Sequence, residues 1–287
     1  MLILGGDITG KIIAPVLQGS DGAYVASFME EERMIPAKDL TATLEMIEGM
    51  GYYPYRTDAR GREMLHDPVV FQKIFEELST ERLKRWLAFA DERLADADAS
   101  VYITGGNDDP MYVESILAGP YKRIIASEGK VVSLDENYEM ISSGYSNPTP
   151  WKCPRDIPED DLLAKIEDLA SHVKDMRNCI FNLHCPPIDS GLDTCPKLDT
   201  TSMPPKPVVK QGKVVMESAG SVSVRKAIEK YQPLLGLHGH IHESPGVTKI
   251  GKTPCLNPGS EYGEGILRGI LINLDKGKIK SYQFTSG

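Results

Sequence analysis

Cysteine is scarce in this sequence, and its pattern excludes two common kinds of scaffold. The chain has 287 residues and five cysteines, an odd number with no Cys-x-x-Cys spacing. Such a set supports neither a disulfide framework nor a structural zinc ribbon, and it predicts a reducing, cytoplasmic compartment. Cys185 follows His184 directly, but neighbouring residues of a strand point to opposite faces, which argues against a cysteine–histidine nucleophile pair.

Long apolar runs and an excess of basic residues are also absent. No run of 18 apolar residues occurs, and the first residues show neither the basic stretch nor the cleavage site of a signal peptide. We therefore predict no membrane partner. The 32 Lys and Arg residues against 41 Asp and Glu residues leave a net charge of −9. This balance argues against nucleic acid as a partner, although an acidic protein can still hold a local metal site for a phosphorylated ligand.

Histidine is rare as well, but it is concentrated in one place. The chain has six histidines, and three of them stand in the segment His238-Gly239-His240-Ile241-His242. Neutral imidazole is the commonest protein ligand for transition metals, and Gly239 would let the backbone come close to a bound group. An apolar run over residues 231–237 predicts a strand that ends at these histidines. Because open α/β sheets bind ligands at the carboxyl ends of their strands, the segment predicts a metal site rather than a histidine-rich surface loop.

The pattern along the chain predicts an α/β protein with a single domain over residues 1–287. Short apolar strands are expected at 1–4, 100–104, 178–183 and 231–237, with helices between them and a hairpin at 269–284. Residues 11–97 have a mostly helical pattern, and 67–97 read as two helices that meet near residues 79–81, where Ser-Thr-Glu is a capping signal. Residues 185–218 are rich in Pro, Asp and Lys and predict a long loop.

A residue with metal-ligand chemistry follows each of the four apolar strands. Asp7 follows the first strand, Asn107 and Asp109 follow the second, and His184 follows the third. The fourth strand is followed by the histidine segment. One such coincidence is weak evidence, but four in series predict a shared site at one edge of the sheet structure.

The motifs that contain these residues resemble those of the calcineurin-like metallophosphoesterase family, in its bacterial and archaeal predicted phosphoesterase branch. They are Gly6-Asp7, Gly106-Asn107-Asp108-Asp109, the lone His184 and Gly239-His240-Ile241-His242. The resemblance implies a sandwich of two mixed β-sheets flanked by helices. It also implies a binuclear centre of two divalent ions, with Mn, Fe, Zn and Ni all compatible with the ligands. Within that resemblance Asp7 bridges the ions, Asn107, His184 and His240 complete one metal site, and His242 belongs to the other.

The resemblance further implies a hydrolase in which a metal-activated water attacks phosphorus in a small phosphorylated substrate. A phosphodiester or a nucleotide is expected. The implied catalytic residues are Asp7, Asn107, Asp108 and His184. Asp108 stands where many family members have a histidine that protonates the leaving oxygen, and an aspartate could do so only with a raised pKa. Asp109 and His238 are expected to orient the ligands rather than bind metal.

The family's first motif, Asp-x-His, does not occur in this sequence. Without it, the second metal site keeps only Asp7 and His242. We therefore state the hypothesis that the first strand is missing from a truncated gene product, and the chain could bind two ions or only one. The alternative function is a non-catalytic metal- or phosphate-binding regulatory protein, and a homo-oligomer remains open.

Overall fold

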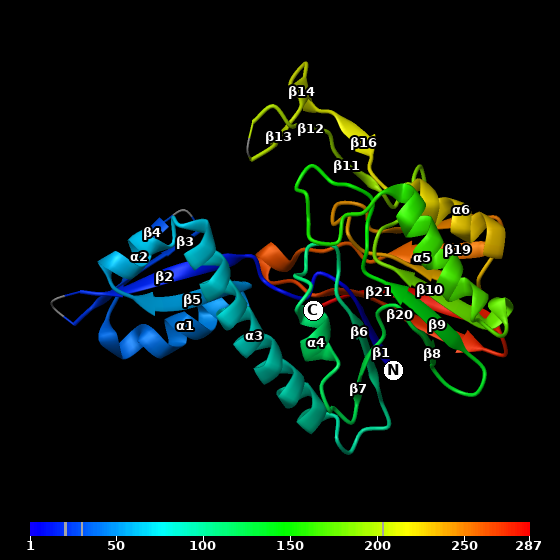
Figure 1. Ribbon diagram of the computed structural model, residues 1–287, viewed down its shortest axis with the longest axis horizontal. Helices are drawn as coiled ribbons and strands as arrows, with labels where there is room; N and C mark the ends of the chain where they lie inside the picture. Colours follow the sequence, from blue (N-terminus) through cyan, green and yellow to red (C-terminus); the bar gives the residue numbers. More distant parts are fainter. Residues whose placement is uncertain (20–21, 30, 203) are drawn as a thin grey trace. The chain divides into compact units, whose positions relative to one another are not determined.

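The structure is a computed structural model that describes residues 1–19, 22–29, 31–202 and 204–287. The chain divides into two compact units (Figure 1). The larger unit comprises Met1–Ile8, Asp91–Glu261 and Leu267–Gly287. The smaller unit comprises Thr9–Ala90 and Tyr262–Ile266. Among the described residues, no helix combines the length and hydropathy needed to cross a lipid bilayer.

The larger unit contains a parallel three-stranded sheet of order β1-β6-β7. β1 (Leu2–Gly5) pairs with β6 (Val101–Thr104) along its whole length, and β6 pairs with β7 (Ile124–Ala126). All four residues of β6 are buried, as expected for a parallel strand covered on both faces. Since β1 and β6 run in the same direction, the loops that follow them leave the same edge of the sheet.

A second, mixed sheet of six strands has the order β18-β19-β17-β10-β9-β8. β9, β10, β17 and β19 run parallel, and β8 and β18 are antiparallel to their neighbours. The strand bounds are β8 Val131–Ser133, β9 Glu139–Ser143, β10 Cys179–Leu183, β17 Leu235–Leu237, β18 Gly246–Ile250 and β19 Thr253–Asn257.

The six-stranded sheet is the middle layer of a sandwich because its strands bury both faces. Phe181 and Leu183 of β10 pack into a core with α5 (Glu159–Ser171) and α6 (Val222–Tyr231). Ile180, which precedes them in the strand, packs into a second core with Tyr102 of β6 and with apolar residues of the hairpin β20 (Arg268–Asp275) and β21 (Lys278–Ser286). This alternation follows from the two-residue period of a strand. The α/β class predicted from the sequence is confirmed.

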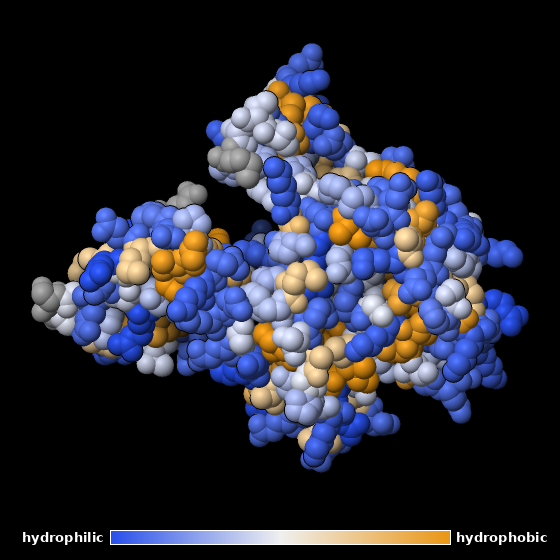
Figure 2. All heavy atoms as spheres, viewed as in Figure 1, coloured by the Kyte–Doolittle hydropathy of each residue, from blue (hydrophilic) through white to orange (hydrophobic). Residues whose placement is uncertain are grey.

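Residues 185–218, predicted to be a long loop, contain short paired strands that form an arm. Ser244 Oγ donates to the carbonyl oxygen of Thr194 at the base of the arm, 2.6 Å away. The arm carries exposed Val209, Val214 and Met216, and apolar colour appears there among hydrophilic side chains (Figure 2). The strands are β11 Thr194–Pro196, β12 Leu198–Asp199, β13 Lys206–Pro207, β14 Val209–Lys210, β15 Lys213–Val214 and β16 Met216–Ser218. The larger unit also contains α4 (Val113–Leu117).

The smaller unit contains the helices expected within residues 11–97 together with a sheet that the helical pattern did not predict. It contains a four-stranded sheet of order β4-β3-β2-β5, covered by helices. Ala14, Val16 and Phe28 of this sheet pack with Ile47 in a separate core, and apolar residues in short strands with Gly-rich breaks were mistaken for helical spacing. The bounds are β2 Ile12–Gln18, β3 Tyr24–Phe28, β4 Glu31–Ile35, β5 Tyr52–Thr57, α1 Leu40–Gly49, α2 Ala59–Met64 and α3 Pro68–Arg93.

α3 is one continuous helix, so the predicted break near residues 79–81 is wrong. Ser79 is buried within the helix, and its hydroxyl donates to the carbonyl oxygen of Phe75 at 2.6 Å. A serine that bonds back to the preceding turn satisfies its polar group without ending a helix.

Candidate metal site

Four residues predicted from the sequence meet at the carboxyl ends of two parallel strand pairs. Asp7 follows β1 and Asn107 follows β6, while His184 follows β10 and His240 follows β17. Asp7, His184 and His240 each offer one ligand atom, and these atoms lie within 4.8 Å of one another. Asn107 joins them through its Oδ1, which lies 2.9 Å from His240 Nδ1. Within the described part of the chain, this is the one group of histidine, cysteine and acidic side chains with metal-binding spacing.

His184 presents a buried nitrogen that has no hydrogen-bond partner among the described residues. Its Nδ1 lies 2.9 Å from the carbonyl oxygen of Gly5, so in the neutral ring Nδ1 carries the proton and donates it there. Nε2 then carries a lone pair. It is buried without a hydrogen bond, yet it lies 3.2 Å from Asp7 Oδ2. Two electron-rich atoms this close repel each other unless a cation, either a proton or a metal ion, lies between them.

The pKa of His184 is raised, which means that its surroundings favour a positive charge on the ring. Burial acts to lower this pKa, but the Asp7 carboxylate, together with the Gly5 carbonyl, raises it above its ordinary value. The site therefore stabilises a cation at Nε2. A divalent ion would satisfy the same charge and both lone pairs at once.

His240 is held in its neutral form. Burial, followed by the neighbouring charge of His184, lowers the pKa of His240 to about 4. Its ring lies 5.3 Å from the ring of His184, centre to centre, at an angle of 66°. A neutral imidazole is the form that binds metals, so His240 is available as a ligand at neutral pH.

Two glycines allow the strand-end loops to approach each other closely. A Cβ at Gly6 would lie 2.5 Å from His184 Nδ1, and one at Gly106 would lie 2.8 Å from Asp7 Cγ and closer still to the Asp7 backbone nitrogen. Asp7 and His240 themselves adopt left-handed backbone conformations, with φ of 50° and 63°. Such residues cluster at functional sites, where the surrounding structure holds them in place.

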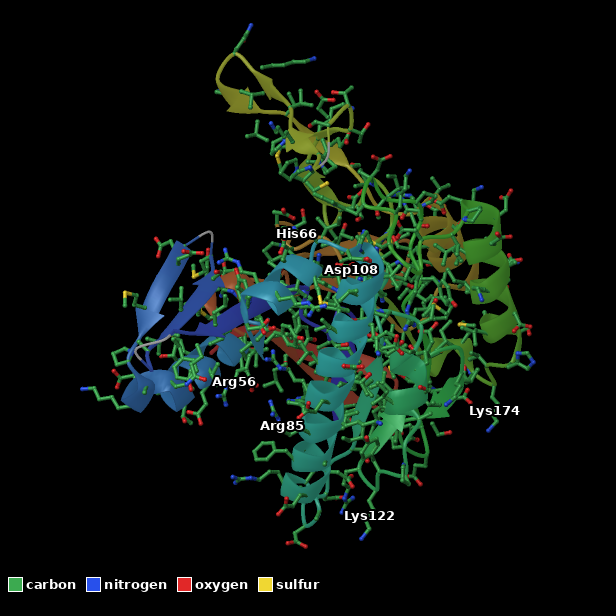
Figure 3. The ribbon with its side chains drawn as sticks, turned by 60° about the vertical axis from the view of Figure 1, so that its left-hand side comes forward. Arg56, His66, Arg85, Asp108, Lys122 and Lys174 are labelled. Carbon is green, nitrogen blue, oxygen red and sulfur yellow. The ribbon has the colours of Figure 1, made fainter. Side chains whose placement is uncertain are left out.

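The remaining predicted residues occupy different positions around this group. Asp109 is fully buried, and its Oδ2 accepts from the backbone N–H groups of Ile8 and Gly106 at 2.9 and 2.8 Å, which ties the first two loops together. Asp108, labelled in Figure 3, is half-buried, and its backbone N–H donates to Asp7 Oδ1 at 3.3 Å. His242 is half-buried and lies outside the three-residue group.

His238 lies beneath the site rather than in it. Its Nδ1 lies 2.8 Å from the carbonyl oxygen of Leu183, at the end of β10, and burial lowers the pKa of His238 to about 4. The ring therefore stays neutral and donates to β10 just before His184. The orienting role expected of His238 stays a prediction.

The thiols near the site are protonated at neutral pH. Burial raises the pKa of Cys185 to about 12, and its Sγ donates to Asn147 Oδ1 at 3.0 Å. Burial also raises the pKa of Cys153 to about 12, and the nearby Asp108 and Asp156 carboxylates act in the same direction. Since the thiolate is the nucleophile and the metal ligand, neither cysteine is poised for such a role.

Sequence reasoning missed Asp156, which contacts the site directly. Its Oδ1 accepts from Asn107 Nδ2 at 2.9 Å across 49 residues of sequence. Asp156 follows a proline-rich loop and matches no motif. Nothing in the local sequence indicates which strand end this loop reaches.

The donor set fits a divalent transition-metal ion. One carboxylate, two imidazoles and one amide oxygen are ligands that Mn, Fe, Zn and Ni accept. The site residues Asp7, Asp108 and Asp109, with Asp156 beside them, also concentrate negative charge, which favours a cation. The residues present therefore fit one such ion.

Comparisons with known proteins give remote similarities. No protein-family model matches the chain. A stretch of 125 residues is 30% identical to MJ1162, an uncharacterized protein of Methanocaldococcus jannaschii; the match covers 43% of this chain and 49% of that protein. The chain thus spans about half the length of the curated relative that it matches.

Two solved structures from Thermus thermophilus are similar in outline. The protein TT1561 has a TM-score of 0.44 and 14% identity, over 71% of this chain and 79% of that chain. The sulfate thiohydrolase SoxB has a TM-score of 0.35 and 15% identity, over 87% of this chain and 41% of that chain. No shared family or activity follows from similarities of this size.

Proposed function

We propose that this protein is a metal-dependent phosphoesterase of the calcineurin-like metallophosphoesterase type, which hydrolyses a small phosphodiester or nucleotide. The observation that carries the proposal is the meeting of ligand-type side chains at one point: the buried Nε2 of His184 faces the Asp7 carboxylate at 3.2 Å, with His240 and Asn107 beside them. This arrangement favours a positive charge between the two groups, which a proton supplies in the metal-free protein and a bound metal ion would replace. The motifs in which these residues stand supply the link from cation binding to phosphate ester hydrolysis.

Asp7, Asn107, His184 and His240 would hold the ion. When bound, a divalent ion would stabilise charge on the phosphoryl oxygens and lower the pKa of a water molecule that attacks phosphorus. Asp7 is preset for this task, since the backbone N–H of Asp108 binds its Oδ1 and leaves Oδ2 towards His184. Asp109 keeps the loops of Asp7 and Asn107 in register through its two backbone hydrogen bonds.

Charge supports the same proposal. The carboxyl groups of Asp7, Asp109 and Asp156 gather here, and each accepts from a backbone or amide N–H group. A phosphate group would be repelled by such a surface, because like charges at short range cost energy in a partly buried site. A bound dication reverses the local sign and allows phosphate to approach.

The proposal has two forms, one with a single bound ion and one with two. The three-residue group with Asn107 accounts for one ion. A second ion, with His242 as a ligand, belongs to the proposal through the family motifs alone. Asp108 is proposed as the proton donor to the leaving oxygen.

The test is metal content together with turnover. The chain is stripped with EDTA and equilibrated with Mn²⁺. Bound ions are then counted, and bis(p-nitrophenyl) phosphate and p-nitrophenyl phosphate are assayed. H184Q should lower the Mn²⁺ affinity by more than the about 10–100-fold typical of changes around a metal site, and it should abolish turnover. H172Q, at an exposed helix end, is the matched control and should change neither.

Each outcome has a distinct meaning. Binding with turnover that requires His184 supports the proposal, and the ion count decides between one and two metals. Binding without turnover of either ester favours the non-catalytic regulatory protein. Absence of Mn²⁺ binding refutes the proposal and leaves only the phosphate-binding form of the alternative.

A further inference from the structure

Asp156 holds the side chain of a proposed metal ligand from a loop that carries no recognised motif. It lies in the segment between β9 and α5. Its Oδ1 accepts from Asn107 Nδ2 at 2.9 Å. Its Oδ2 accepts from three donors of its own loop, namely the backbone N–H and hydroxyl of Thr149, at 2.9 and 2.5 Å, and the backbone N–H of Cys153, at 2.9 Å.

This arrangement dictates which end of the Asn107 amide faces the site. An ionised carboxylate only accepts hydrogen bonds, so the NH2 group of Asn107 must turn towards Asp156. The amide oxygen must then point the other way, and it lies 2.9 Å from His240 Nδ1. The oxygen is the end of an amide that binds a cation.

We infer that Asp156 is a positioning residue that fixes the Asn107 amide with its oxygen towards the cation site. The inference rests on the proposed function, since it assigns Asp156 a task only if the site binds a cation. The neighbouring residue reinforces the arrangement: the backbone N–H of Arg155 donates to the Asn107 carbonyl oxygen at 3.1 Å. With its backbone held, the main freedom left to Asn107 is rotation of the side-chain amide, which Asp156 removes.

The variant D156N reverses this control without changing the size of the side chain. The introduced amide has one oxygen, and the three donors of the loop require an acceptor where Oδ2 now lies. The new NH2 group therefore faces Asn107, whose amide flips to offer its oxygen. The NH2 of Asn107 then points into the cation site, and Mn²⁺ affinity should fall about 10–100-fold, as when other partners of metal ligands are lost.

A second substitution should restore binding. In N107D/D156N the carboxylate introduced at position 107 accepts from the amide at position 156 and still offers an oxygen to the site, because both its oxygens are acceptors. The double variant also keeps the net charge of the wild type. A merely structural role for Asp156 does not predict this recovery.

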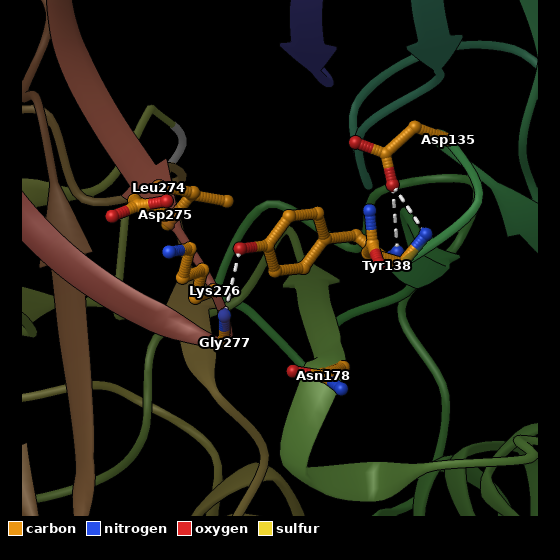
Figure 4. A pocket seen from close by; sticks show the side chains of 8 residues that line it. Asp135, Tyr138, Asn178, Leu274, Asp275, Lys276 and Gly277 are labelled. Carbon is orange, nitrogen blue, oxygen red and sulfur yellow. Dashed lines mark hydrogen bonds between the residues drawn. The ribbon is translucent and has the colours of Figure 1, made fainter.

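The control is D135N, in a turn remote from the site. Asp135 also organises its own loop, since its Oδ1 accepts from the backbone N–H groups of Asn137 and Tyr138 at 2.7 and 2.9 Å. It lines a cavity of about 360 Å³ with Tyr138 and Asn178, next to the amino ends of β9 and β10 and thus at the opposite edge of the sheet from the site (Figure 4).

The experiment is calorimetric titration of the metal-free proteins with MnCl₂, with a thermal unfolding curve for each variant. The inference predicts weak binding by D156N and near wild-type binding by D135N and N107D/D156N. Equal affinity of D156N and wild type, equal losses in D156N and D135N, or no recovery in the double variant would each overturn it. Failure of the wild type to bind Mn²⁺ would instead refute the proposed function, and the inference with it.

Discussion

A single methyl group at Gly106 should damage the site, because the loops after β1 and β6 touch there. The Cβ of G106A would lie 2.8 Å from Asp7 Cγ and closer to the Asp7 backbone nitrogen, well inside contact distance. The backbone cannot yield easily, since β1 and β6 pair up to Gly5 and Thr104. Overpacking of this kind costs about 1–3 kcal/mol of unfolding free energy. A displaced Asp7 also loses its ligand geometry, and a shift of about 0.5 Å already impairs a preorganised site.

The matched control is G239A, which adds the same methyl group beside another of the proposed ligands, His184. A Cβ at Gly239 would lie 3.7 Å from His184 Nδ1, an ordinary contact. Urea unfolding of the metal-free proteins and calorimetric titration with Mn²⁺ measure both effects. We expect G106A to lose stability and Mn²⁺ affinity and G239A to keep both. A G106A protein with wild-type stability and affinity would refute the close packing on which the site is built.

Three further predictions concern the proton of His184 and the buried Arg155. Mn²⁺ affinity should rise with pH through the raised pKa of His184 and level off above it, because the metal displaces a proton from Nε2; calorimetry at several pH values checks this, and a flat profile would contradict it. In the metal-free protein, protonation of His184 stabilises the folded state, because the pKa of His184 is higher there than in the unfolded chain. This contribution is complete below the unfolded-state pKa of about 6.5 and is lost as the pH rises through the folded-state pKa. R155M should lower the unfolding free energy by about 3 kcal/mol, the low end of the cost of breaking a buried ion pair. Arg155 is fully buried and pairs with the partly exposed Glu114 at 2.6 Å, and its guanidinium also donates to the Asp109 carbonyl oxygen. Urea unfolding measures it, and a loss within error of zero would show that these contacts do not matter.

The convergence of Asp7, Asn107, His184 and His240 could be predicted because each follows an apolar strand. Parallel strands expose their carboxyl ends at one edge, so a local pattern carries long-range information. The four side chains do meet in the structure. Their chemical roles remain predictions.

Other features were out of reach because they depend on contacts between distant segments. Asp156 reaches Asn107 across 49 residues, and no local pattern encodes that meeting. A serine that caps a helix and a serine whose hydroxyl donates to the preceding turn cannot be told apart by sequence. Ser79 is the second kind, since its hydroxyl donates to the Phe75 carbonyl oxygen within α3. The sheet of the smaller unit could not be predicted, because short apolar runs fit both the two-residue period of a strand and the 3.6-residue period of a helix.

The most direct test of the account is to locate the ion. Crystals of the metal-free protein soaked with Mn²⁺ should show an anomalous diffraction peak within bonding distance of His184 Nε2 and Asp7 Oδ2, flanked by Asn107 Oδ1 and His240. Such a peak would establish the cation that the buried lone pair demands. A saturating soak that leaves this position without a peak, or that places the ion elsewhere, would contradict the central claim.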